Sequence, residues 1–120
     1  MSSGQERSGD SLRDLGDLLR SFAQARDWEK YHTPKNLAMA LAGETGELVA
    51  CFQWMTATES VHAMQDPVNA TDIESEMADV LQYLIRLADV LNIDLAEAVR
   101  KKVQLNEKRF PPPPSSRLSH

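Results

Sequence analysis

Apolar residues recur at three- and four-residue spacing in four segments of this chain. This spacing places them on one face of an α-helix. Helices are therefore expected at about 11–31, 33–54, 71–91 and 94–109. No segment shows the every-second-residue alternation of a half-buried strand. Because a helix with one apolar face must bury it against another element, the sequence predicts an all-α fold built as a four-helix bundle.

Helix-start signals support these boundaries. Thr33 can cap a helix in which Pro34 takes the first position. The stretch 71–74, Thr-Asp-Ile-Glu, has the form of a capping box, and Asp94 is placed to cap the last helix. Between them, residues 56–70 are expected to form a loop that contains a short helical turn. The ordered domain should span 11–110, between disordered tails at 1–10 and at the proline-rich 111–120.

Composition excludes several classes of protein. The 120-residue chain has a formal charge of −5 and no basic run, so neither nucleic acid nor a membrane is an expected partner. Its N-terminus lacks the apolar region of a signal peptide. A single cysteine, Cys51, permits no internal disulfide and favours a reducing, cytoplasmic setting. The sequence also has neither zinc-ligand spacing nor a P-loop.

Two acidic pairs lie on the apolar stripes of the second and third predicted helices. Glu44 and Glu47 are three residues apart, as are Glu76 and Asp79, so each pair points to one side of its helix. If the two sides face each other, four carboxylates share a pocket suited to Mg²⁺, an ion that commonly brings a phosphate. The alternative is that all four acids lie at the edges of the stripes and reach solvent.

A family resemblance favours the first interpretation. Residues 26–37, RDWEKYHTPKNL, lead into GETGELVACFQW, and the second acidic pair and KKVQLNEKRFP follow. Over residues 12–111 this order resembles the MazG-like nucleotide pyrophosphohydrolases, and most of all their small all-α dCTP pyrophosphatases. The resemblance implies cleavage of a nucleoside triphosphate between its α and β phosphates. It also implies a homotetramer, built as a dimer of dimers, with sites at the subunit contacts.

The resemblance also assigns residues. It places the metal ligands at Glu44, Glu47, Glu76 and Asp79, with Mg²⁺ as the cofactor and Mn²⁺ as a substitute. Either Glu44 or Glu47 is the candidate base for the attacking water. The candidates for binding the substrate comprise aromatic residues, a histidine and a basic helix end: Trp28, His32, Trp54, Tyr83, Lys102, Asn106 and Arg109.

Plainer interpretations of these substrate-binding candidates remain open. The aromatic residues can be core residues, and the basic residues can be a solvated helix end favoured by the helix dipole. Base stacking tolerates many bases, so the aromatic residues do not choose one. The resemblance favours dCTP, although Leu19 stands where some dCTP-type relatives have a histidine. Another nucleotide or a diphosphate is an alternative substrate, and a non-catalytic four-helix interaction module is an alternative function.

Overall fold

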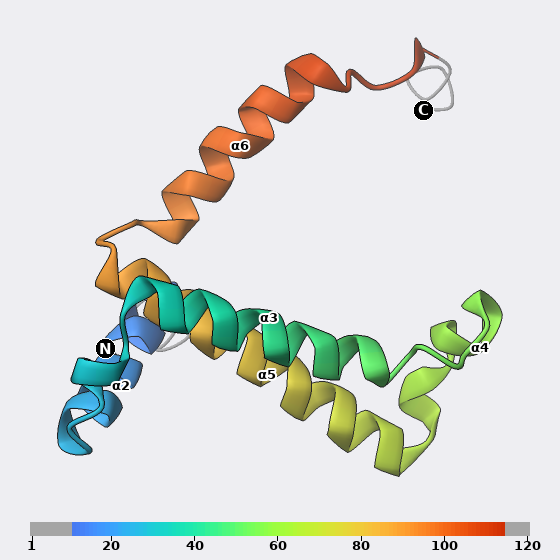
Figure 1. The fold of residues 1–120 in the computed structure, drawn as a ribbon. Coiled ribbons are helices and arrows are strands. Elements are labelled where there is room, and N and C mark those ends of the chain that lie inside the picture. The colour runs from blue at the N-terminus through green and yellow to red at the C-terminus, as the bar shows by residue number, and fades with distance from the viewer. Residues whose placement is uncertain (1–10, 115–120) are drawn as a thin grey trace, which may run out of the picture.

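The computed structural model describes residues 11–114, which form five α-helices, two short 3₁₀ helices and no strand (Figure 1). In chain order these are α2 (Leu12–Ala25), η1 (Glu29–Tyr31), α3 (Pro34–Ala50), α4 (Ala57–Val61), η2 (Ala63–Gln65), α5 (Pro67–Val90) and α6 (Leu95–Arg109). The all-α class is confirmed, and the count of four helices is wrong because α4 is a helix of its own. Of the tails predicted at 1–10 and 111–120, residues 1–10 and 115–120 lie outside the described residues.

The helices α3 and α5 lie side by side and antiparallel, and they form the main packing unit (Figure 1). Helix α2 packs on α5 near its C-terminal end. The buried apolar side chains at these contacts are small in number: Ala23, Leu37, Ile73, Ile85 and Ala88. One chain therefore holds a thin core, and much of its apolar surface stays exposed.

Helix caps account for most of the boundaries. The Thr33 and Asp94 side chains accept hydrogen bonds from the third residues of α3 and α6, as predicted. The start of the third predicted helix was wrong, because α5 begins at Pro67, four residues before Thr71, and is capped by Asp66. Proline is well suited to a first helical position, so the helix starts there. Thr71 lies inside α5 and donates its hydroxyl to the Pro67 carbonyl at 3.0 Å.

The first helix is also shorter than predicted. It ends at Ala25, and Asp27 adopts a left-handed backbone with φ of 56°. The Trp28 amide then donates to the Ala23 carbonyl at 3.0 Å, which is the closing bond of a Schellman motif. This turn redirects the chain into η1, so Trp28 and the residues up to His32 form a separate connection between α2 and α3.

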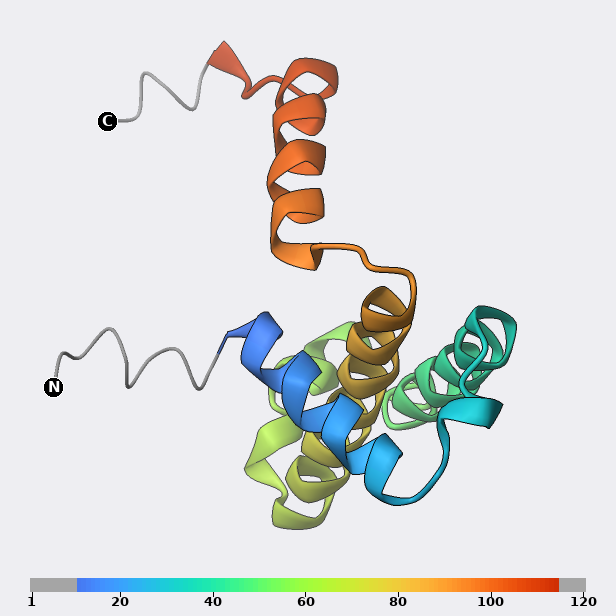
Figure 2. The same cartoon turned by 90° about the vertical axis from the view of Figure 1, so that its left-hand side faces the viewer.

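Helix α6 stands apart from the rest of the chain (Figure 2). It has no buried residue and no extended packing contact with another described helix. Val99, Val103 and Leu105 are consequently exposed, with Val99 at 58%. The predicted compact four-helix bundle is therefore not closed within a single chain. None of the helices in residues 11–114 is long and apolar enough to cross a membrane.

Candidate functional site

Three of the four predicted acids meet where α3 packs on α5. Glu44 comes from α3, and Glu76 and Asp79 come from one face of α5. One carboxylate oxygen of each lies within 4.8 Å of the others, and all three side chains are half-buried. Packing of the two apolar stripes brings the acids together, since each acid lies on its own stripe.

The position of Glu76 shows that this cluster suits a cation. Its Oε2 atom is buried and has no hydrogen-bond partner among the described residues. Burial, followed by the charges of Glu44 and Asp79, raises the pKa of the Glu76 carboxyl. A buried carboxylate oxygen without a partner is unfavourable, and a bound cation would satisfy it. An all-oxygen donor set fits a hard divalent ion such as Mg²⁺.

Glu47 lies outside this group of three. It follows Glu44 by three residues, which leaves its side chain rotated by about 60° around α3, and it is exposed. Its negative charge nevertheless contributes to the raised pKa values of Glu76 and of the Cys51 thiol. Glu47 is thus a neighbour of the cluster with an oxygen free to face solvent, and this distinguishes it from Glu44.

We expect Glu76→Gln to raise the thermal stability of the metal-free protein, because the substitution removes one of three crowded negative charges. The pKa of Glu76 is raised above its ordinary 4.5, so the folded state holds this proton more tightly than the unfolded chain. The contribution of Glu76 to stability should therefore improve as the pH falls through the folded pKa toward 4.5. Thermal unfolding scans across this pH range, without metal, measure both effects. A lower melting temperature for Glu76→Gln at neutral pH would contradict them.

The two tryptophans proposed for the base do not meet within one chain. Trp28 lies before α3 and Trp54 lies after it, and the 17 residues of that helix span about 25 Å. Trp28 makes an edge contact with Phe22, at a centroid distance of 5.6 Å, and also lies beside His32. Trp54 is 89% exposed. A base pocket that contains both tryptophans therefore requires a second chain.

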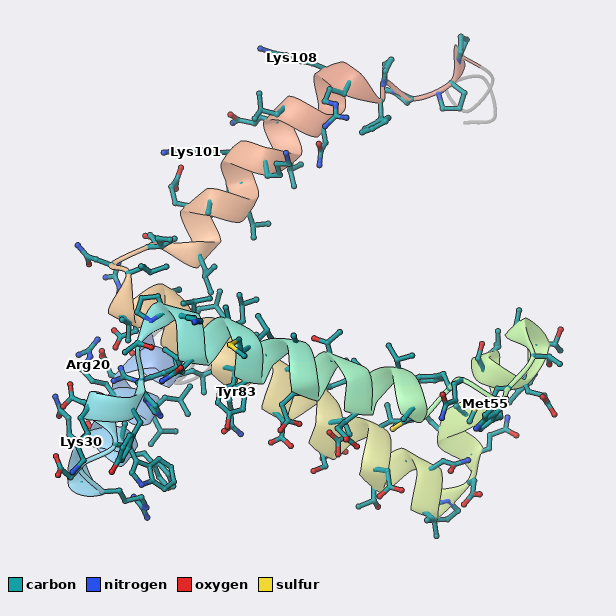
Figure 3. The ribbon with its side chains drawn as sticks, in the orientation of Figure 1. Arg20, Lys30, Met55, Tyr83, Lys101 and Lys108 are labelled. Carbon is teal, nitrogen blue, oxygen red and sulfur yellow. The ribbon has the colours of Figure 1, made fainter. Side chains whose placement is uncertain are left out.

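The other candidates are also divided between two regions. Tyr83 is half-buried on α5 and lies one turn beyond Asp79, near the middle of the α3–α5 pair (Figure 3). Lys102, Asn106 and Arg109 lie on α6, which projects away from that pair (Figure 1). The structure thus brings Tyr83 toward the acids and leaves the basic helix end away from the acids of its own chain.

Sequence reasoning missed a charged network beside Trp28. Arg86 of α5 is buried, at 5% exposure, and donates to His32 Nδ1 at 3.0 Å and to Asp89 Oδ2 at 2.6 Å. Arg20 of α2 pairs with the same aspartate. These hydrogen bonds, with the charges of both arginines, lower the pKa of Asp89. A signal was available, since Arg86 is a charged residue within the otherwise apolar run 84–88, LIRLA.

Comparisons with known proteins agree on one family. The model of the MazG-like family matches residues 40–119. The proteins named dCTP pyrophosphatase 1 of Mus musculus and Homo sapiens are both 42% identical over 101 residues, which cover 84% of this chain. The chain spans 59% of the length of these curated relatives. A solved pyrophosphatase from Archaeoglobus fulgidus superposes with a TM-score of 0.78 at 41% identity, covering 84% of this chain and 93% of that one.

Proposed function

The chain belongs to the MazG-like family, and we propose that it is a divalent-metal-dependent nucleoside triphosphate pyrophosphohydrolase. It would cleave the bond between the α and β phosphates and release a nucleoside monophosphate and pyrophosphate. The main support for this proposal is the carboxylate cluster of Glu44, Glu76 and Asp79, in which the buried Oε2 atom of Glu76 has no hydrogen-bond partner among the described residues. The pyrophosphatase names of the relatives support the reaction class.

The residues of the cluster divide into two roles. Glu44, Glu76 and Asp79 would hold Mg²⁺, with Mn²⁺ able to substitute. When bound, such an ion neutralises phosphate charge and lowers the pKa of a coordinated water. Glu47 lies beside the cluster without being part of it, so it is the better placed acid to orient the attacking water and accept its proton.

We further propose that the working site is shared between chains of a homotetramer. Helix α6 exposes an apolar face that nothing within residues 11–114 covers, and Trp54 is exposed as well. Gly43 and Gly46 add a second argument. An interior helical glycine costs about 1 kcal/mol relative to alanine, yet a Cβ at either position would meet nothing within 4 Å. Close packing of another chain on this face of α3 would explain both glycines.

In such an assembly the groups that one chain separates can meet. Lys102, Asn106 and Arg109 of one chain would contact the triphosphate held by the acids of another. Arg109 could bind two phosphate oxygens through its guanidinium fork. Trp54 of a second chain would complete a base pocket with Trp28, His32 and Tyr83. A nucleotide-sized ligand would then touch at least two chains.

For the substrate we propose a deoxynucleoside triphosphate with a pyrimidine base, dCTP first. The support is the name of the curated relatives, together with the tryptophans. Stacking on tryptophan stabilises binding by about 1–3 kcal/mol per base, but it discriminates little between bases. Choice must come from polar groups at the edge of the base, and His32, whose ring lies 6.2 Å from that of Trp28 between centroids, is a candidate.

The test is a panel of dCTP, halogenated and methylated dCTP, dTTP, dUTP, dITP, dATP and dCDP, each with Mg²⁺ or Mn²⁺. We expect pyrophosphate release to be metal-dependent, with the highest kcat/KM for dCTP or one of its modified forms. Equal values for dCTP and dTTP, or a purine ahead of both, would contradict the preference and leave the reaction intact. Absence of pyrophosphate from every triphosphate would favour a non-catalytic interaction module.

A further inference from the structure

Arg86 is the one charged side chain that the described part of the chain buries, and its contacts are directional. Its Nε donates to His32 Nδ1 at 3.0 Å, and its Nη1 donates to Asp89 Oδ2 at 2.6 Å. Its Nη2 lies 4.0 Å from a carboxylate oxygen of Glu29. A buried guanidinium is tolerated only when charged or polar partners surround it, and Asp89 and His32 supply these at short range.

The position of Arg86 is fixed from both sides. Asp89 lies one turn away on the same helix and is held in turn by Arg20 from α2. Arg86 therefore cannot turn toward solvent without breaking its hydrogen bond to Asp89. Its Nε–H stays aimed at the connection between α2 and α3, where His32 lies.

This contact determines the protonation of His32. Arginine stays protonated and has no acceptor, so the Nδ1 atom of His32 must accept the hydrogen bond. A neutral imidazole that accepts at Nδ1 carries its proton on Nε2 and is a donor there. Burial, followed by the charge of Arg86, lowers the pKa of His32, while Glu29 opposes them. The imidazolium form is therefore disfavoured, and the ring presents one donor.

The donor lies beside the proposed base pocket. The His32 and Trp28 rings are 6.2 Å apart between centroids. On α5, Arg86 follows Tyr83 by three residues and Asp79 by seven, so all three share a face that is about 10 Å long. A ligand whose phosphates bind at Asp79 would extend along this face past Tyr83 toward His32.

We infer that Arg86 is a positioning residue, which locks His32 in the Nε2–H tautomer so that it donates a hydrogen bond to an acceptor atom of the nucleoside beside Trp28. The inference rests on the proposed function for the identity of the ligand and on the hydrogen bond from Arg86 for the tautomer. It assigns a specificity role to a residue that lies behind the pocket and does not touch the substrate.

The first experiment needs no substrate and measures the wild-type protein, with one variant used only to assign signals. Two-bond ¹H–¹⁵N correlation spectra of ¹⁵N-labelled wild-type protein distinguish the two neutral tautomers and the imidazolium. His32→Gln assigns the His32 signals by their disappearance. We expect His32 at pH 7 to be neutral, with a proton on Nε2 and none on Nδ1. A protonated Nδ1, in either the other tautomer or the imidazolium, would overturn the inference.

The second experiment compares Arg86→Met with Arg20→Met. Both variants remove one arginine from Asp89, and only the first removes the hydrogen bond to His32. We expect Arg86→Met to lose the tautomer preference and to raise KM for dCTP about tenfold, the effect of one hydrogen bond, with kcat changed less than about threefold. Arg20→Met should keep the tautomer and the KM of the wild type.

The outcomes separate this inference from the proposed function. If wild-type protein releases pyrophosphate and folded Arg86→Met shows an unchanged KM, the positioning role is wrong and the enzyme assignment stands. An equal rise in KM for both variants would show that the two arginines act only by holding the local structure, and it would also overturn the inference. If Arg86→Met does not fold, the tautomer of the wild-type protein still decides. Absence of pyrophosphate from the wild-type protein counts against the proposed function instead.

Discussion

Replacing Asp79 by asparagine is expected to lower kcat for the preferred nucleotide by about three orders of magnitude. The substitution removes a charged oxygen from the cluster that Asp79 shares with Glu44 and Glu76, and so weakens binding of the metal. The helical fold should survive, because the asparagine side chain has nearly the same volume. A pyrophosphate-release assay at saturating Mg²⁺ measures the loss, and far-ultraviolet circular dichroism checks the fold.

Glu74→Gln is the matched control, since Glu74 is an exposed acid of the same helix and lies outside the cluster. It should keep wild-type activity. Glu47→Gln should also abolish turnover, and thermal scans with Mg²⁺ then separate its role from that of Asp79. If the replaced residue is a metal ligand, Mg²⁺ should raise the melting temperature of the variant less than that of the wild type. If the replaced residue is the base, Mg²⁺ should stabilise the variant as much as the wild type. Retained turnover in both Asp79→Asn and Glu47→Gln would refute the assignment of the site.

Replacing both Val99 and Val103 by aspartate is expected to dissociate the proposed tetramer into monomers. Turnover should be lost as well, because the proposed site is shared between chains. The two valines are four residues apart on the exposed apolar face of α6, and burying each is worth about 1.5–3 kcal/mol. In a homotetramer this loss of buried apolar surface is repeated in every subunit. Sedimentation at micromolar concentration should show wild-type protein at four times 13.4 kDa and the variant near 13.4 kDa.

Lys101→Asp is the control for this substitution. Lys101 lies on the same helix and points away from α3 and α5 (Figure 3). It is two residues from both valines, so its side chain lies on the opposite face of α6. The same aspartate there should leave the tetramer intact. Wild-type protein that sediments as a monomer, or an active monomeric double variant, would show that one chain holds the whole site.

Residues that act through their near neighbours in the chain were predictable from the sequence. The all-α class followed from apolar spacing, and the Thr33 and Asp94 caps from side chains that bond the backbone three residues on. The pairing of Glu44 with the acids of α5 was also predictable, because each acid lies on the stripe that its helix must bury. These features depend on helical geometry, which repeats the same way in every helix.

Features that depend on which segments meet were decided by the tertiary structure. The rotation of α3 against α5 placed Glu44 in the cluster and left Glu47 beside it.

The contact between Arg86 and His32 joins residues 54 positions apart. No local pattern encodes such a contact, since its energy depends on which buried groups lack a partner after the helices have packed. For the same reason the exposed face of α6 was visible as a stripe in the sequence, while its separation from the rest of the chain was not. A stripe shows that a face must be covered, and only the packing of whole helices shows that the other described helices of its chain do not cover it.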